Sequence, residues 1–131
     1  LVVSGWSAGG HLTAMALPDA DAGLAISGVF DITPCRLNYL NDALQLTVEE
    51  QLTLSPIRQL PARSGPLVIA YGTGELPELQ RQSRDYHAAR LAAQLPSELL
   101  PLEGHDHFSI LEELADPDGQ LTKALVRYAG G

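Results

Sequence analysis

The chain has 131 residues, of which 45% are hydrophobic and 18% charged, and a formal net charge of −8 at pH 7. This composition is typical of one ordinary globular domain. The negative charge argues against nucleic acid or an anionic membrane as a partner, because both are bound through clustered lysine and arginine. No apolar run approaches membrane-spanning length. The single cysteine, Cys35, cannot form an internal disulfide, so we expect a cytoplasmic protein.

The first residues carry the pattern around which the chain is organised. A short apolar run, Leu1–Ser4, leads into the glycine-rich stretch Gly5–Gly10, and a helical pattern follows from Leu12 to Leu17. The spacing Gly-x-Ser-x-Gly between a strand and a helix is typical of a nucleophile elbow. We therefore predict that Ser7 is a nucleophile and that the backbone N–H of Ala8 faces the oxyanion that forms there.

The two motif glycines, Gly5 and Gly9, meet the steric need of such a turn, in which a strained serine requires small neighbours. A glycine-rich turn that only packs a helix on a sheet is one alternative interpretation of the motif. A phosphate-binding loop is another. The motif lacks the lysine of a Walker loop and the spacing of a dinucleotide fingerprint, which favours the nucleophile.

Three further strands are predicted, each a short apolar or β-branched run bounded by glycine or proline. They cover Gly23–Gly28, Pro66–Gly72 and Glu98–Leu102. The irregular stretch from Val29 to about Asn41 follows the first of them. It predicts a loop at a strand's carboxyl end, where α/β folds place substrate contacts.

A long amphipathic helix is predicted from Pro77 to Leu95, with Tyr86, Leu91 and Leu95 near the apolar face and Arg90 away from it. Two shorter helices are predicted from Ile110 to Leu114 and from Leu121 to Tyr128. Strands and helices alternate, which predicts an α/β fold: a parallel sheet with helices on both faces, formed by residues 1–131 as a single domain.

Acidic and histidine side chains follow the later strands. In α/β-hydrolases the nucleophile, the acid and the histidine occur in that order, each after a different strand. Glu75 follows the predicted strand Pro66–Gly72, and His107 follows Glu98–Leu102. The order predicts a catalytic triad of Ser7, Glu75 and His107, in which the histidine moves the serine proton and the acid stabilises the imidazolium.

Other residues compete for these roles. His105 lies on the same loop as His107, which we favour because Phe108 and the apolar helix start behind it would fix the ring. Asp31 is the alternative acid, and otherwise a loop-capping residue. Asp106 is too close to His107 in sequence for suitable geometry.

The remaining candidates are more typical of structural roles. His11 and His87 lie in predicted helices, where packing or solvent exposure is the ordinary role. Trp6 could line an aromatic pocket, although packing against the elbow is the commoner role for a tryptophan there. No spacing of histidine, cysteine and acidic residues predicts a metal site.

Five passages together carry a resemblance to a known family. They are Gly5–Leu12, Ser27–Ile32, Leu54–Ile57, Gly72–Glu75 with Gln82 and Ser83, and Asp106–Phe108. The chain resembles α/β-hydrolases of the esterase and lipase type, specifically the group similar to kynurenine formamidase. The resemblance implies the same roles for Ser7, Glu75 and His107. It also implies hydrolysis of a small carboxylic ester or an aryl formamide through an acyl-enzyme, without a cofactor.

The chain departs from the family in one respect. The resemblance implies a His-Gly-Gly segment upstream of the elbow that supplies oxyanion donors, and the sequence contains none. We therefore expect a partial domain, the carboxyl-terminal half of a larger hydrolase. Losing one oxyanion donor costs about 10²–10³ in rate, so this part alone should be nearly inactive.

The same departure bears on partners and on the alternative function. The strand Leu1–Ser4 would have an unpaired edge, which the missing half or an oligomer partner would cover. The alternative function is a non-catalytic α/β-hydrolase-like module retained for binding or assembly. A complete set of serine, glutamate and histidine opposes that alternative.

Overall fold

The computed structural model describes residues 1–32, 47, 49 and 54–129, so residues 33–41 of the predicted loop lie outside the described part. Within it, four parallel strands form one sheet in the order β1-β2-β3-β4. The strands are β1 (Val2–Trp6), β2 (Ala22–Ile26), β3 (Leu67–Gly72) and β4 (Ser97–Leu102). The predicted parallel sheet is confirmed. Every residue of β2 and β3 is buried, as expected for central strands covered on both faces.

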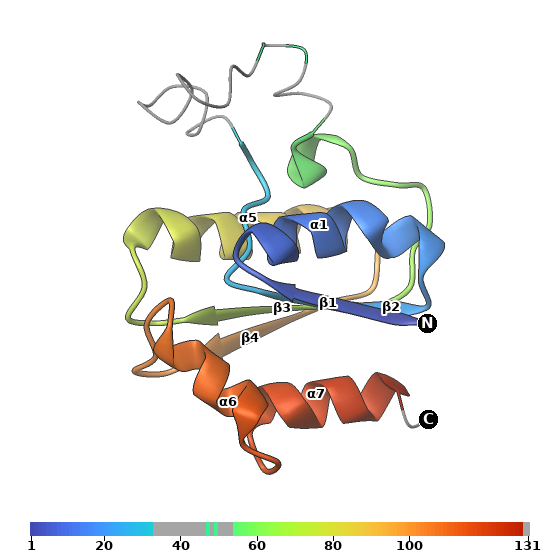
Figure 1. The fold of residues 1–131 in the computed structure, drawn as a ribbon. Helices are drawn as coiled ribbons and strands as arrows, with labels where there is room; N and C mark the ends of the chain where they lie inside the picture. Colours follow the sequence, from blue (N-terminus) through green and yellow to red (C-terminus); the bar gives the residue numbers. More distant parts are fainter. Residues whose placement is uncertain (33–46, 48, 50–53, 130–131) are drawn as a thin grey trace.

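Helices cover both faces of this sheet, as the sequence predicts (Figure 1). The helices α1 (Ala8–Ala16) and α5 (Pro77–Ala92) lie on one face. The helices α6 (Glu112–Ala115) and α7 (Gln120–Ala129) lie on the other. No helix among the described residues is long and apolar enough to cross a membrane.

Alternate residues of the central strands point into two separate cores. Leu24 and Val68 join the core under α7, together with Leu121. Ala25 and Ile69 join the core under α1 and α5. Because all four strands run in the same direction, their carboxyl ends meet at one edge of the sheet, and the loops that follow them lie close together there.

The long helix α5 ends at Ala92, earlier than the predicted Leu95. Gln94 adopts a left-handed conformation with φ 61°. Its N–H donates to Leu91 O at 3.0 Å, and the N–H of Leu95 donates to Arg90 O at 2.9 Å. This is the paired bonding of a Schellman motif, which satisfies the last carbonyls of the helix and stops it.

The predicted apolar face of α5 is partly wrong. Leu91 is exposed, whereas the Arg90 side chain is completely buried. One guanidinium nitrogen, Nη2, donates to Ser64 Oγ at 2.9 Å and to Pro96 O at 2.8 Å, while Nε and Nη1 have no partner in the described part of the chain. Helical periodicity assigned arginine to solvent, but the connections into β3 and β4 offer oxygen acceptors that bind it inside.

Ser83 supplies a prediction about stability. Its side chain is fully buried, and its hydroxyl has no hydrogen-bond partner among the described residues. We expect Ser83→Ala to raise the free energy of unfolding by about 1 kcal/mol, because the substitution removes a desolvated, unpaired polar group. Urea unfolding monitored by circular dichroism measures the change.

Ser55 provides the matched control for that measurement. It is equally buried, but its Oγ accepts the N–H of Ile32 at 2.9 Å. Ser55→Ala should therefore lower the free energy of unfolding by about 1–2 kcal/mol, since a buried N–H loses its acceptor. Equal destabilisation by the two substitutions would contradict the assignment of Ser83 as an unpaired group.

Candidate active site

Ser7 sits at the turn between β1 and α1 in a strained backbone conformation, with φ 60° and ψ −117°. A non-glycine residue adopts such a conformation only when its surroundings hold it there. The Ser7 N–H donates to Ile26 O of the neighbouring strand at 2.9 Å, and its carbonyl accepts the N–H of Gly10 at 2.9 Å. These two bonds tie the turn to the sheet below it and to the helix after it.

The elbow requires glycine at two positions. A Cβ on Gly5 would lie 2.2 Å from Gly9 O, and a Cβ on Gly10 would lie 2.8 Å from Gly28 Cα. A Cβ on Gly9 would meet no atom within 4 Å. The steric prediction therefore holds for Gly5 and is wrong for Gly9. The second position that requires glycine is Gly10, because α1 passes close to the end of β2 there.

The structure brings together the three side chains that the sequence singled out. His107, on the loop after β4, places Nε2 3.1 Å from Ser7 Oγ. Its Nδ1 lies 2.7 Å from Oε1 of Glu75, on the loop after β3. A carboxylate only accepts, so Nδ1 carries the proton and Nε2 is free to accept the serine hydroxyl proton.

Glu75 is buried, and both of its carboxylate oxygens have partners. Oε1 accepts from His107, while Oε2 accepts from Ser27 Oγ at 2.8 Å and from the N–H of Gly72 at 2.7 Å. Burying a carboxylate costs free energy unless donors replace its water, and these three donors do so. Sequence reasoning missed Ser27. The available signal was its place just after β2, since the ends of adjacent parallel strands β2 and β3 lie side by side.

Two known proteins with similar sequences are kynurenine formamidases. The chain is 32% identical to the kynurenine formamidase of Danio rerio over 145 residues, and 32% identical to that of Salmo salar over 146 residues. Each alignment covers 99% of this chain and 50% of the relative. The chain thus spans about half the length of the curated relatives it matches. No protein-family model matches it.

Solved structures agree with the sheet topology. A thioesterase-like protein from Silicibacter superposes with a TM-score of 0.77 at 25% identity, covering 92% of this chain and 48% of its own. Esterase 2 of Thermogutta terrifontis, with propionate bound, gives 0.73 at 25% identity, covering 98% of this chain and 56% of its own. The chain has an α/β-hydrolase fold. It resembles formamidases in sequence and esterases in fold.

The histidine loop of this α/β-hydrolase fold is held by Trp6. The indole Nε1 donates to the His107 carbonyl at 2.8 Å, and the two ring centroids are 4.9 Å apart. The expectation that Phe108 fixes the imidazole from behind is wrong, because Phe108 is 71% exposed and meets the ring only edge-on, with centroids 5.3 Å apart. Trp6 instead fixes the loop from the elbow side, where it packs against the core.

Asp106 shapes the same loop without taking part in the hydrogen-bonded triad. Its Oδ1 accepts the N–H groups of Ser109 at 2.7 Å and of Phe108 at 2.8 Å. These bonds hold the pKa of the Asp106 carboxyl below its ordinary value, and the bond from Ser109 has the larger effect. The prediction that Asp106 is not the acid partner of His107 agrees with this geometry.

The alternative histidine, His105, points toward α6 instead of the elbow. Its Nδ1 lies 3.1 Å from Ser109 Oγ, and its Nε2 lies 3.2 Å from Glu113 Oε1. The pKa of Glu113 is lowered, chiefly by the N–H of Gln120 and then by His105. The His105 carbonyl accepts the N–H of Gly74 at 2.9 Å, so this residue joins the two loops that carry Glu75 and the triad histidine.

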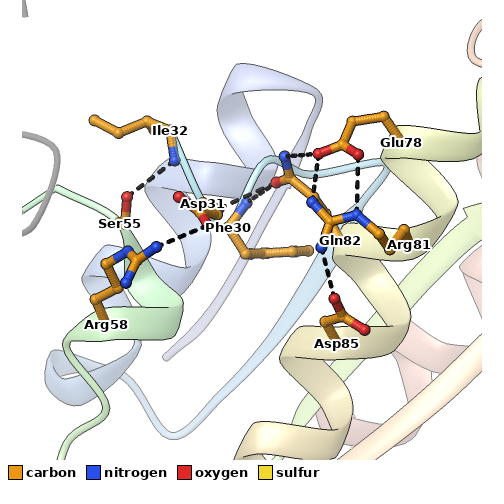
Figure 2. A network of polar contacts seen from close by, with 9 residues as sticks. All are labelled: Phe30, Asp31, Ile32, Ser55, Arg58, Glu78, Arg81, Gln82 and Asp85. Atoms are coloured by element: carbon orange, nitrogen blue, oxygen red, sulfur yellow. Dashed lines mark hydrogen bonds and ion pairs between the residues drawn. The ribbon is translucent and has the colours of Figure 1, made fainter. Parts of the chain in front are cut away.

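The alternative acid, Asp31, belongs to a different network (Figure 2). Its carboxylate forms an ion pair with Arg58 at 3.4 Å, and its N–H donates to Gln82 Oε1 at 3.1 Å. Gln82 Oε1 also accepts the N–H of Phe30 at 2.9 Å. Asp31 thus anchors the chain after β2 to α5, while the acid bonded to His107 is Glu75.

The other two histidines make structural contacts. His11 Nε2 donates to Leu54 O at 2.6 Å, and His87 Nδ1 lies 2.7 Å from Ser97 Oγ. Burial is the larger of two causes that lower the pKa of His87. In the described part of the chain, no group of three histidine, cysteine or acidic residues could hold a metal ion.

Ala8 begins α1 and is exposed. The first N–H groups of a helix have no carbonyl partner within it, and the helix dipole makes this end positive. The predicted oxyanion donor therefore lies directly beside Ser7, at a helix end that favours negative charge.

Proposed function

We propose that the protein containing this chain is a serine hydrolase that cleaves small carboxylic esters or aryl formamides through an acyl-enzyme. The observation that carries the proposal is the continuous hydrogen-bonded chain from Ser7 Oγ through both nitrogens of His107 to Glu75. Similarity to kynurenine formamidases and to an esterase supports these two substrate classes. Both are acyl compounds whose ester or amide bond a serine nucleophile cleaves by the same steps.

In the first half of the reaction, Ser7 Oγ attacks the carbonyl carbon while its proton passes to His107 Nε2. Glu75 stabilises the imidazolium that forms. The carbonyl oxygen becomes an oxyanion next to the N–H of Ala8. When the tetrahedral intermediate collapses, the alcohol or arylamine leaves with the proton from Nε2, and the acyl group stays on Ser7.

Water completes the cycle. His107 Nε2 takes a proton from the water as its oxygen attacks the acyl carbon, and the second tetrahedral intermediate collapses when that proton returns to Ser7 Oγ. An ester then yields its carboxylic acid, and an aryl formamide yields formic acid. Each step uses the single proton that Nε2 can hold while Nδ1 remains bonded to Glu75.

The hydrogen-bonded triad also favours catalysis over a non-catalytic binding module. A module used only for binding has no need of a strained serine, an imidazole bonded to it and a fully bonded carboxylate behind that imidazole. The proposal covers the substrate and the activity of the whole protein. It also includes a partner for the open edge of β1, either the other half of the hydrolase or an oligomer partner, and a cytoplasmic location.

A fluorophosphonate probe tests the proposal on the full-length protein. The probe reacts with serines that a neighbouring base activates, so we expect a covalent adduct on Ser7, located by peptide mass spectrometry. His107→Ala should reduce the labelling rate by about 10²–10⁴, since general-base assistance contributes that much. An unlabelled Ser7 in folded protein would instead support the non-catalytic module.

A further inference from the structure

Ser27 follows β2 immediately and combines two unusual properties. It is a non-glycine residue with φ 50°, and it is 1% exposed. Its N–H donates to Ala70 O of β3 at 2.8 Å. Its hydroxyl donates to Glu75 Oε2 at 2.8 Å. Side chains are rare in this backbone region, where strain persists only if the surroundings impose it.

The backbone turn alone does not explain a serine at this position. Glycine adopts a positive φ without strain and would make the same turn. What serine adds is a hydroxyl donor in a buried place, aimed at the carboxylate that bonds His107. The strain and the hydrogen bond therefore occur in the same residue, next to the site.

Glu75 Oε2 is held from two strands at once. Gly72, at the end of β3, donates its N–H at 2.7 Å, and Ser27 donates its hydroxyl from the end of β2. With one donor the carboxylate can rotate about its terminal bond. With two donors on the same oxygen, the other oxygen is directed at His107 Nδ1.

We propose that Ser27 is a positioning residue for the acid: its hydroxyl orients Glu75 so that Oε1 holds the imidazole in line with Ser7. The proposal rests on the proposed hydrolase function. The hydrogen bonds of Ser27 go to Glu75 and Ala70 and, among the described residues, not to Ser7. Its effect therefore falls on the orientation of the imidazole and hence on kcat, and we expect substrate binding to change little.

Two substitutions separate this role from a purely structural one. Ser27→Ala removes the hydroxyl and keeps the strain, whereas Ser27→Gly removes the hydroxyl and relieves the strain. Both should lower kcat by about 10-fold to 100-fold, the range expected for losing one hydrogen bond to a charged group, with little change in KM. Ser27→Gly should nevertheless melt roughly 2–5 °C above Ser27→Ala, because glycine tolerates the positive φ.

A structural role predicts the opposite pattern. If Ser27 only stabilises the fold, activity follows stability and Ser27→Gly regains wild-type kcat, which would overturn the proposal. Ser55→Ala is the matched control, because it removes another buried serine hydroxyl, which bonds the N–H of Ile32 and, among the described residues, no triad side chain. It should lower the melting temperature and leave kcat unchanged.

A double-mutant cycle tests whether the effect passes through the acid. In a Glu75→Ala background, Ser27→Ala should lower kcat by less than about twofold, since no carboxylate remains to be oriented. A full additive loss would overturn the proposal, because it would mean that Ser27 acts on another group.

Proton NMR of the full-length protein keeps the proposal testable apart from the hydrolase activity. The His107 Nδ1–H resonance should shift in Ser27→Ala and stay in place in Ser55→Ala, whether or not the protein turns over an ester. An inactive wild-type protein would count against the proposed function alone. An active wild type whose Ser27 variants keep both kcat and this resonance would count against the positioning role alone.

Discussion

Ser7→Ala is expected to lower kcat for an ester or aryl formamide substrate by about 10⁴–10⁶ in the full-length protein, which is the loss seen when a triad nucleophile is removed. The substitution removes the only atom that forms the acyl-enzyme. Stability should change little, because within the described part of the chain Ser7 Oγ bonds only His107, and that bond is part-buried. Steady-state hydrolysis of an aryl ester measures the rate, and circular dichroism verifies the fold.

The triad should also behave as one unit. His107→Ala alone should lower kcat about as much as Ser7→Ala, and the double variant should fall no further, because each residue is useless without the other. Losses that multiply in the double variant would show that Ser7 and His107 act independently. That outcome would contradict the proposed mechanism, even if each single variant were inactive.

Gly5→Ala is expected to destabilise the protein by about 3 kcal/mol and to lower kcat by at least about 10², although residue 5 is not one of the three triad residues. Its Cβ would lie 2.2 Å from Gly9 O, a backbone atom of α1 that cannot turn aside as a flexible side chain could. Either β1 or the start of α1 must move. Because Ser7 lies between them, the nucleophile moves as well.

Gly9→Ala is the matched control for that prediction. It changes the other glycine of the same motif in the same way, yet its Cβ meets nothing within 4 Å. Because alanine favours the helix more than glycine does, the free energy of unfolding should stay level or rise by up to about 1 kcal/mol. Chemical denaturation of both variants gives the comparison. A Gly5→Ala variant as stable as Gly9→Ala would mean that the clash at Gly5 is relieved at no cost.

Short sequence segments were sufficient to predict the strands and the order of serine, acid and histidine along the chain. Ser7, Glu75 and His107 each follow an apolar run that ends at glycine or close to it, and parallel strands bring their following loops to one edge. Of the two histidines on this loop, His107 lies at Ser7 and His105 bonds Glu113, but the reason for preferring His107 is partly wrong. The imidazole is fixed by Trp6, 101 residues earlier in the chain, and Phe108 is largely exposed.

Contacts made across long sequence distances escaped local reasoning. Arg90 was placed among the solvent-facing residues of its helix, but carbonyl groups from two connecting segments bind it in the interior. Ser27 lies in one of the passages that resemble the hydrolase family, but the sequence assigns it no role. Its hydroxyl matters because Glu75, 48 residues later, lies beside it.

Local sequence patterns were therefore sufficient to predict the fold class, the elbow and Ser7 as the candidate nucleophile, since each pattern involves residues a few positions apart. The orientation of the acid, the support of the histidine loop and the burial of a guanidinium depend on which strands are neighbours in space. Hydrophobic periodicity records which face of an element is buried. It does not indicate which polar groups of neighbouring strands and loops lie next to that face, and those groups set the geometry of the site.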